Sequence, residues 1–334
     1  MKNKQIILAE RPTGMPDEHT FKFVEEDILS LTDGQVLIQT HYVSVDPYMR
    51  GRMIDAESYV EPFKVGEVIE GGSIGEVIES KSSVFEKGDM VIGGFGWQQY
   101  YVAGEKEVRK IDPKLAPAST YLGILGMTGL TAYFGLLEIG KPKAGETIVV
   151  SGAAGAVGSV VGQIAKIQGA RVVGIAGSEE KIKFLKEELD FDEVINYKTT
   201  DDISAELRKT CPDGVDVYFD NVGGAISDAV LNQLNRLARV PVCGAISSYN
   251  LTEIDYGPRV QSILIKKSAL MQGFTVGNYA NRFQEGASQL GQWLQEGKLT
   301  YQETIKTGFD TIPEAFLDLF RGNNIGKLLV KVNQ

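Results

Sequence analysis

The chain has 334 residues, 43% hydrophobic and 23% charged, so it is long enough for two domains with separate cores. A net charge of −10 argues against a nucleic-acid partner, because binding to a phosphate backbone depends on clustered Lys and Arg. No run approaches the roughly 18 apolar residues of a membrane span, and the N-terminus lacks a signal-peptide pattern. The sequence therefore predicts a soluble cytoplasmic protein.

Metal ligands are scarce. The only cysteines are Cys211 and Cys243, with no CxxC pair, and the only histidines are His19 and His41. A catalytic zinc needs about three convergent ligands and a structural zinc needs about four. We therefore expect no metal site and no disulfide framework.

Up to about residue 110 the chain consists of short β-like runs separated by turn residues: QVLIQTHYVSV, GSIGEVIES and GDMVIGGFGWQQYYVA. This spacing predicts an antiparallel barrel or sandwich. From Tyr121 the segment GILGMTGLTAYFGLLEIG has apolar residues at helical spacing and stops at Gly140. We place a domain boundary just before it, so that the first domain covers residues 1–120.

The chain then alternates strands and helices. The predicted strands are TIVVSG, ARVVGIAG, EVINY, VDVYFDNVGG and RVPVCGAIS. This alternation predicts an α/β fold with a doubly wound parallel sheet over residues 121–298. The tail, residues 299–334, contains a helix and then a strand that could return to the first domain.

The strand TIVVSG leads directly into the helix-like segment AAGAVGSVVGQIAKIQGA, which places Gly152, Gly155 and Gly158 three residues apart at the junction. Glycines here allow a tight turn and let a pyrophosphate approach the N-terminus of a helix. The glycines follow a predicted strand and precede a predicted helix, and a second predicted strand comes after that helix. This order favours a dinucleotide site over glycines that serve only helix packing.

The end of the second strand predicts which dinucleotide binds. An NAD enzyme usually places Asp or Glu here for the ribose 2′-hydroxyl, but this strand ends in Gly177 and Ser178, followed by Lys181. The uncharged end and the nearby cation favour NADP(H) over NAD, although Glu179 and Glu180 are close. Tyr197 could cover the adenosine side or could be a core aromatic.

At this point the chain resembles, over almost its whole length, the zinc-independent medium-chain dehydrogenase/reductases, and within them the leukotriene 12-hydroxydehydrogenase/15-oxoprostaglandin 13-reductase group. The motifs are SVDPYMRGRM, GMTGLTAY, SGAAGAVGSVVGQIAK, FDNVGG, CGAISSYN and GNNIGK. The resemblance implies a GroES-like barrel as catalytic domain, a Rossmann domain and a homodimer. It also implies NADPH-dependent reduction of the carbon–carbon double bond of α,β-unsaturated aldehydes and ketones.

The resemblance also implies site residues. The pyrophosphate would lie on Gly155, Ala156, Val157 and Gly158, and the adenosine side on Lys181 and Tyr197. The nicotinamide and its ribose would be lined by Asn221, Cys243, Gly244, Ala245, Ile246, Ser247, Ser248, Tyr249, Phe274, Thr275, Val276 and Asn324. A tyrosine proposed in some members to aid proton transfer has no equivalent here, because the segment has Lys266 instead.

Reduction of an enone places negative charge on the carbonyl oxygen, which hydroxyl donors can stabilise. Tyr48 and Tyr249 are the candidates, because the resemblance puts both of their loops at the cleft; Tyr59 is weaker. Each of these tyrosines could instead only pack against substrate or cofactor. Arg50 could attract a substrate carboxylate or pair with a nearby one. A quinone reductase and a cofactor-binding protein without turnover stay open as alternatives.

Overall fold

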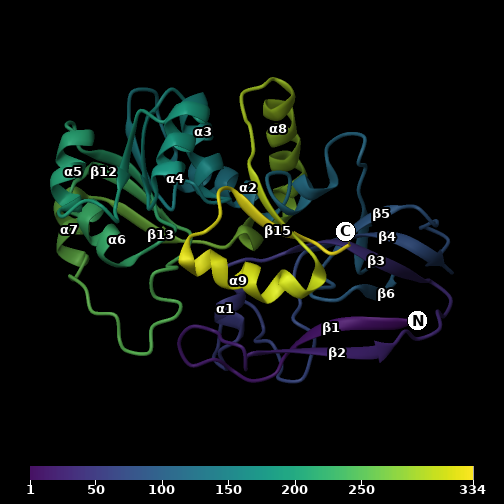
Figure 1. Cartoon of the computed structure of the whole chain (residues 1–334). Helices are drawn as coiled ribbons and strands as arrows, with labels where there is room; N and C mark the ends of the chain where they lie inside the picture. The colour runs from purple at the N-terminus through teal and green to yellow at the C-terminus, as the bar shows by residue number, and fades with distance from the viewer. Residues whose placement is uncertain (334) are drawn as a thin grey trace. The chain divides into compact units, whose positions relative to one another are not determined.

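The computed structural model describes residues 1–333, which form two compact units (Figure 1). Unit 1 comprises residues 1–122, 303–324 and the C-terminal residues from Leu328 on. Unit 2 comprises residues 123–302 and 325–327. Each unit is described separately below.

Unit 1 is rich in antiparallel strands. β1 (Lys2–Leu8) pairs with β2 (Phe21–Asp27), and a seven-stranded sheet has the order β14-β15-β3-β4-β5-β7, with β6 also paired to β3. Its strands are β3 (Gln35–Ser44), β4 (Ser73–Ser80), β5 (Met90–Gly93), β6 (Tyr100–Gly104), β7 (Val108–Lys110), β14 (Glu303–Thr307) and β15 (Lys327–Lys331). The helices of this unit are α1 (Met49–Arg52), η1 (Ala118–Leu122), η5 (Phe309–Thr311) and α9 (Ile312–Arg321).

The main core of unit 1 contains residues from both its N-terminal part and its C-terminal part. Trp97 is fully buried and packs edge-on to Phe316 of α9, with ring centroids 5.8 Å apart. Phe21 of β2 contacts both rings. The predicted return of the tail, a helix followed by a strand, is therefore present as α9 and β15, which pairs with β3.

Unit 2 contains a six-stranded parallel sheet of order β10-β9-β8-β11-β12-β13. Numbered from β8, this is the 3-2-1-4-5-6 order of a dinucleotide-binding sheet. The strands are β8 (Thr147–Ser151), β9 (Arg171–Ala176), β10 (Glu193–Asn196), β11 (Val215–Phe219), β12 (Leu234–Val242) and β13 (Leu270–Gly273). The helices are α2 (Met127–Phe134), η2 (Gly135–Gly140), α3 (Gly158–Ile167), α4 (Glu179–Lys183), η3 (Phe184–Glu188), α5 (Ile203–Thr210), α6 (Gly224–Leu231), α7 (Gln261–Lys267), η4 (Val276–Arg282) and α8 (Phe283–Gln295).

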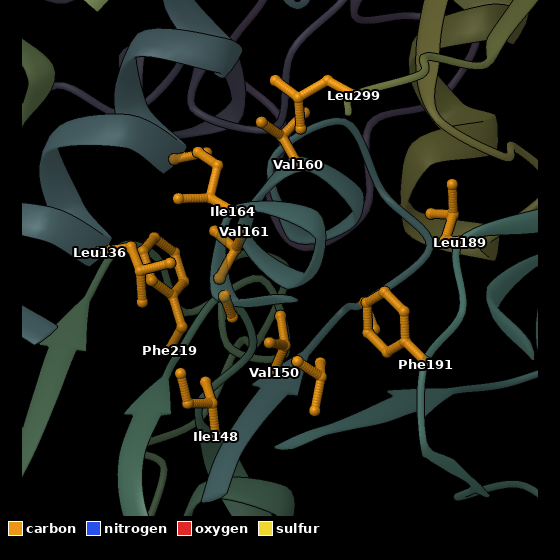
Figure 2. Packing of buried hydrophobic residues seen from close by; sticks show 14 of the residues in the cluster. Leu136, Ile148, Val150, Val160, Val161, Ile164, Leu189, Phe191, Phe219 and Leu299 are labelled. Carbon is orange, nitrogen blue, oxygen red and sulfur yellow. The ribbon is translucent and has the colours of Figure 1, made fainter. Parts of the chain in front are cut away.

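Helices cover both faces of this sheet. Ile148 and Val150 of β8 belong to a core with α2, α3 and α8, whereas Val149, on the opposite face, packs in a core with α5 and α6. Figure 2 shows Val150 near Val161 of α3, and Ile148 below Phe219 in the same cluster. Because successive side chains of a strand point to opposite faces, an all-apolar strand such as β8 needs cover on both.

The predicted fold class, a β-rich domain with a doubly wound parallel-sheet domain, is confirmed. Residues 299–302 and 325–327, which the sequence analysis placed with the first domain, lie in unit 2. For residues 325–327 the reason is a backbone contact: Gly326 N–H donates to the carbonyl of Ala154 at 2.8 Å, and Gly326 forms a parallel bridge with Gly155. Residues 299–302 are held by the Gln163 side chain, which bonds to the backbone of Thr300.

Candidate functional site

The turn between β8 and α3 brings together the three glycines of the predicted phosphate site. Gly152 has a φ of 59°, a left-handed conformation that glycine adopts without steric cost. At Gly158 a Cβ atom would lie 2.4 Å from the carbonyl oxygen of Gly152. The N–H of Gly155 donates to that same oxygen at 3.0 Å. The turn, completed by Ala156 and Val157, ends at the N-terminus of a ten-residue helix, which suits a pyrophosphate.

The second strand, β9, ends beside the side chain of Tyr197. A Cβ atom on Gly177 would lie 2.7 Å from an atom of the Tyr197 ring, so the ring lies directly against the Gly177 backbone. Tyr197 N–H donates to the carbonyl of Ala176 at 3.1 Å, and its side chain is 40% exposed. Its position at the open end of the sheet therefore suits a ligand contact better than a core role.

Two cations lie near this strand end. Ser178 caps α4 by accepting a hydrogen bond from the backbone N–H of Lys181 at 3.3 Å. Burial, with a further contribution from the positive charge of Lys198, lowers the pKa of Lys181 against the opposing effect of Glu180. The carboxylate of Glu179 instead accepts a hydrogen bond from the Asn196 side chain at 2.9 Å. Two lysine side chains therefore lie near this strand end.

The carboxyl ends of β8 and β11 meet at the point where the strand order reverses, which is where ligands bind in such sheets. Asn221 joins the two ends, because its backbone N–H donates to Ser151 Oγ at 2.9 Å and its side-chain amide donates to the Ser151 carbonyl at 2.8 Å. The loop after β12 returns to the same place. Cys243 N–H donates to the carbonyl of Asp220 at 2.8 Å, and Ser247 N–H to that of Val222 at 3.1 Å.

Tyr249 is oriented by its own loop. Its hydroxyl oxygen accepts the backbone N–H of Ala245 at 3.2 Å, and burial raises the pKa of the phenol. The oxygen is therefore held in place while the O–H remains available as a donor. The other predicted residues of the loop are half-buried or, for Ser247, exposed: Gly244, Ile246, Ser247 and Ser248.

The segment after β13 is ordered by local contacts. The ring of Phe274 packs edge-on to Phe219, with centroids 6.2 Å apart. Thr275 is the N-cap residue of η4, and its backbone N–H donates to Asn278 Oδ1 at 2.8 Å. Val276, the first residue of η4, is half-buried. Lys266 lies on α7 and is exposed.

Four predicted residues lie in unit 1. Tyr48, directly before α1, packs against the main core of that unit, and burial followed by the nearby charge of Asp46 raises the pKa of its phenol. Tyr48 therefore keeps its proton at neutral pH. Tyr59 is 70% exposed, and Asn324, after α9, is buried.

The side chain of Arg50 connects two segments of unit 1. Its guanidinium is only 2% exposed and donates to the carbonyl of Gly14 at 2.7 Å and to that of Pro12 at 3.3 Å. These contacts tie the loop after β1 to α1. These printed partners are backbone carbonyl groups, and contact of Arg50 with a substrate carboxylate stays a prediction.

Three residues of this site were not singled out from the sequence. Ser151 is the last residue of β8, Asp220 directly follows β11, and Lys198 follows Tyr197. The sequence did contain signals for these residues. Two of them are polar residues at the ends of apolar strands, and the third is a cation beside a predicted adenosine contact. Only pairing in the sheet shows that these side chains converge.

Within residues 1–333, no group of three or more His, Cys, Asp or Glu side chains is arranged to hold a metal ion. None of the helices in that range combines the length and the apolar character needed to cross a membrane.

Two family models match the chain. One, described as the N-terminal domain of oxidoreductase, covers residues 4–111, and one, described as zinc-binding dehydrogenase, covers residues 156–293. The second match includes part of the glycine turn and the loops after β11 and β12.

Similar proteins cover almost the whole chain. A Bacillus subtilis (strain 168) protein with the provisional name NADP-dependent oxidoreductase YfmJ is 64% identical over 99% of this chain and 98% of its own. The NADPH-dependent curcumin reductase of Escherichia coli (strain K12) is 44% identical, over 99% and 97%. The 2-alkenal reductase (NADP(+)-dependent) of Nicotiana tabacum is 43% identical, over 100% and 98%. A crystal structure of CurA from Vibrio vulnificus in complex with NADPH has a TM-score of 0.94 and 45% identity, over 99% of each chain.

Proposed function

The chain belongs to the zinc-independent medium-chain dehydrogenase/reductases, and we propose that it uses NADPH to reduce the carbon–carbon double bond of α,β-unsaturated aldehydes and ketones. The observation that carries this proposal is similarity over the full length to a curcumin reductase and to a 2-alkenal reductase. Both names describe reductases of conjugated carbonyl compounds.

The test is NADPH oxidation, followed at the absorbance of the reduced nicotinamide, with a panel of 2-alkenals, alkenones, curcumin and quinones. We expect turnover with the enones, saturated carbonyl products and much weaker activity with NADH. Activity on quinones alone would favour the quinone reductase. Tight NADPH binding without oxidation by any compound of the panel would favour a binding protein without turnover.

The residues of unit 2 fit NADP(H). The three glycines of the turn present backbone without a side chain, and Gly158 leaves no room for a Cβ atom. Lys181 on α4 and Lys198 after β10 lie near the end of β9, and the strand is followed directly by the uncharged Gly177 and Ser178. We assign the pyrophosphate to the turn, the 2′-phosphate to this strand end and the nicotinamide side to Asn221 and the loop Cys243–Tyr249.

The bound NADPH supplies the hydride. The chain's own contribution is to stabilise the negative charge that gathers on the carbonyl oxygen of the substrate. Hydroxyl donors can do this without a metal ion, because O–H groups held in place before the reaction need little reorganisation. Tyr48 and Tyr249 both carry neutral, partly buried phenols, and we assign this role to them. Tyr59 is exposed and is a weaker candidate.

Replacing Lys181 by Ala should raise the KM for NADPH by about tenfold, because one charge-assisted hydrogen bond to phosphate is lost. The KM for NADH, which lacks the 2′-phosphate, should stay within twofold of wild type. Initial rates with one enone and varied cofactor measure both values. An equal rise of the two KM values would contradict the assignment.

A matched control is Lys183→Ala on the same helix, which removes an exposed lysine whose ion-pair partner is Glu187 at 3.8 Å. This change should leave both KM values unchanged.

We also propose a homodimer formed through the edge of the parallel sheet in unit 2. Among the described residues, β13 pairs only with β12, and Leu270 at its start is 47% exposed. Ile265 on the preceding α7 is 79% exposed. An apolar open edge strand is a template for pairing with another chain, and a two-fold axis lets the same edge serve both copies.

The double change Ile265→Glu and Leu270→Lys should convert the dimer to a monomer, because each copy would place two charges in the interface. Size-exclusion chromatography with light scattering measures the mass. A wild-type chain that is already a monomer at micromolar concentration would contradict the proposal.

We place the protein in the cytoplasm. Cys211 and Cys243 are both free thiols, as is usual in a reducing compartment. Fractionation of cells expressing the full chain, with detection by antibody, tests this placement.

A further inference from the structure

Asp220, the residue after β11, has an unusually well-satisfied side chain. The residue is only 2% exposed, and one oxygen of its carboxylate accepts four hydrogen bonds. The donors are Ser151 Oγ at 3.0 Å, the hydroxyl of Tyr218 at 2.8 Å, and the backbone N–H groups of Val222 at 3.0 Å and Gly223 at 2.9 Å. A buried carboxylate is costly unless donors of this kind surround it.

These donors belong to separate parts of the site. Ser151 ends β8, Tyr218 lies on β11, and the two N–H groups belong to the turn before α6. Ser151 Oγ, while donating to Asp220, also accepts the backbone N–H of Asn221. The carboxylate therefore determines where the Asn221 backbone lies, through one intervening hydroxyl.

The backbone of Asp220 orders a second segment. Its carbonyl accepts the N–H of Cys243 at 2.8 Å and that of Gly244 at 3.2 Å, at the start of the loop Cys243–Tyr249. Its charge also reaches this loop: burial, and after it the charge of Asp220, raises the pKa of the Cys243 thiol to about 12. One residue thus connects both segments assigned to the nicotinamide side.

We propose that Asp220 is a positioning residue: it holds Asn221 and the loop Cys243–Tyr249 in the geometry that binds the nicotinamide half of the cofactor, without touching the cofactor itself. This inference rests on the proposed NADPH-dependent function. Its consequence is selective, because the adenosine half is assigned to Lys181 on α4 and to residues directly after β9 and β10, and none of the donors to the Asp220 carboxylate comes from these segments.

The experiment compares two ligands of the full-length chain, NADPH and 2′,5′-ADP, which carries only the adenosine half with its 2′-phosphate. In Asp220→Asn the Kd for NADPH should rise by about tenfold, because a neutral amide oxygen accepts the four bonds more weakly. The kcat should fall as well. The Kd for 2′,5′-ADP should stay within twofold of wild type. Isothermal titration calorimetry measures both affinities.

Ser151→Ala provides a second variant that keeps the buried charge and removes only the hydroxyl between Asp220 and Asn221. It should change the two affinities in the same selective way, and it decides the question if Asp220→Asn does not fold. Asp216→Asn is the matched control. Asp216 is on β11 at the opposite end, where its carboxylate accepts the N–H of Thr147 at 2.9 Å and the side-chain amide of Asn235 at 2.8 Å. Its loss should lower the Tm and leave both affinities unchanged.

Wild-type affinity for NADPH in Ser151→Ala and in a folded Asp220→Asn would overturn the inference while the proposed function stands. An equal loss of affinity for NADPH and 2′,5′-ADP would also overturn it, because that result indicates general loosening of unit 2. A wild-type chain that binds neither ligand would overturn the proposed function and this inference together.

Discussion

Replacing Tyr48 by Phe should lower kcat for enone reduction by about a hundredfold, the usual effect of removing one donor from an oxyanion site. A tyrosine phenol is protonated at neutral pH, and burial raises the pKa of Tyr48 further, so its O–H is available as a donor. The phenylalanine ring retains the packing against the core of unit 1, where Tyr48 is one of the partly buried residues. The Kd for NADPH should therefore not change, and stopped-flow measurement of NADPH oxidation with saturating enone gives the chemical step directly.

Two further variants make this result interpretable. Tyr249→Phe should also lower kcat, and it should raise the KM for NADPH, because the Ala245 N–H loses the oxygen that accepts it. Tyr101→Phe is the control, since this hydroxyl contacts only Glu107 at 3.3 Å, on the surface. Turnover within twofold of wild type in Tyr48→Phe would remove Tyr48 from the mechanism.

Replacing Gly158 by Ala should weaken NADPH binding by up to about a hundredfold, since overpacking a close contact typically costs 1–3 kcal/mol. The new Cβ would lie 2.4 Å from the carbonyl oxygen of Gly152 and 2.8 Å from Cα of Ala153, which are backbone atoms without a rotamer to change. Relief requires α3 to move away from β8, and this movement displaces the N-terminal N–H groups. NADPH fluorescence titration measures the affinity, and thermal unfolding should show a lower Tm.

Gly155→Ala is the matched variant in the same turn. Its Cβ would meet only the Gly152 carbonyl oxygen, at 3.2 Å, so a shift of a few tenths of an ångström suffices. We expect a smaller loss of affinity than in Gly158→Ala. The reverse order would show that approach of the ligand to Gly155, and not the β8–α3 contact, limits binding.

Local pattern was enough to predict the central strands and several helices of unit 2. The strand TIVVSG became β8, all of it buried, and the helix-like segment EEKIKFLKEEL became α4 and η3, with Phe184 and Leu185 buried. These predictions depend only on the spacing of apolar residues and on capping residues such as Ser178. Both can be identified from residues close together in the sequence. Tyr197 was ambiguous for the same reason, because its exposure is set by Gly177, twenty positions earlier.

The residues of the site that sequence reasoning missed depend on long-range pairing. Asp220 was visible within FDNVGG, but its importance comes from Ser151, 69 positions away, which is its neighbour only because β8 and β11 are adjacent in the sheet. Gly326 pairs with the glycine turn across an even longer separation. The spacing of apolar residues within one segment does not predict such contacts between distant segments.

The sequence by itself determined the two kinds of domain, the strand-turn-helix that suits a dinucleotide and the uncharged strand end that favours NADP(H), since these follow from side-chain size, periodicity and charge along the chain. Only the tertiary structure decided that Arg50 donates to backbone carbonyls, that Tyr197 lies on Gly177, and that Asp220 gathers donors from two strands and a turn. The physical reason is that burial and hydrogen-bond partners are properties of the assembled sheet, where segments far apart in sequence come within bonding distance.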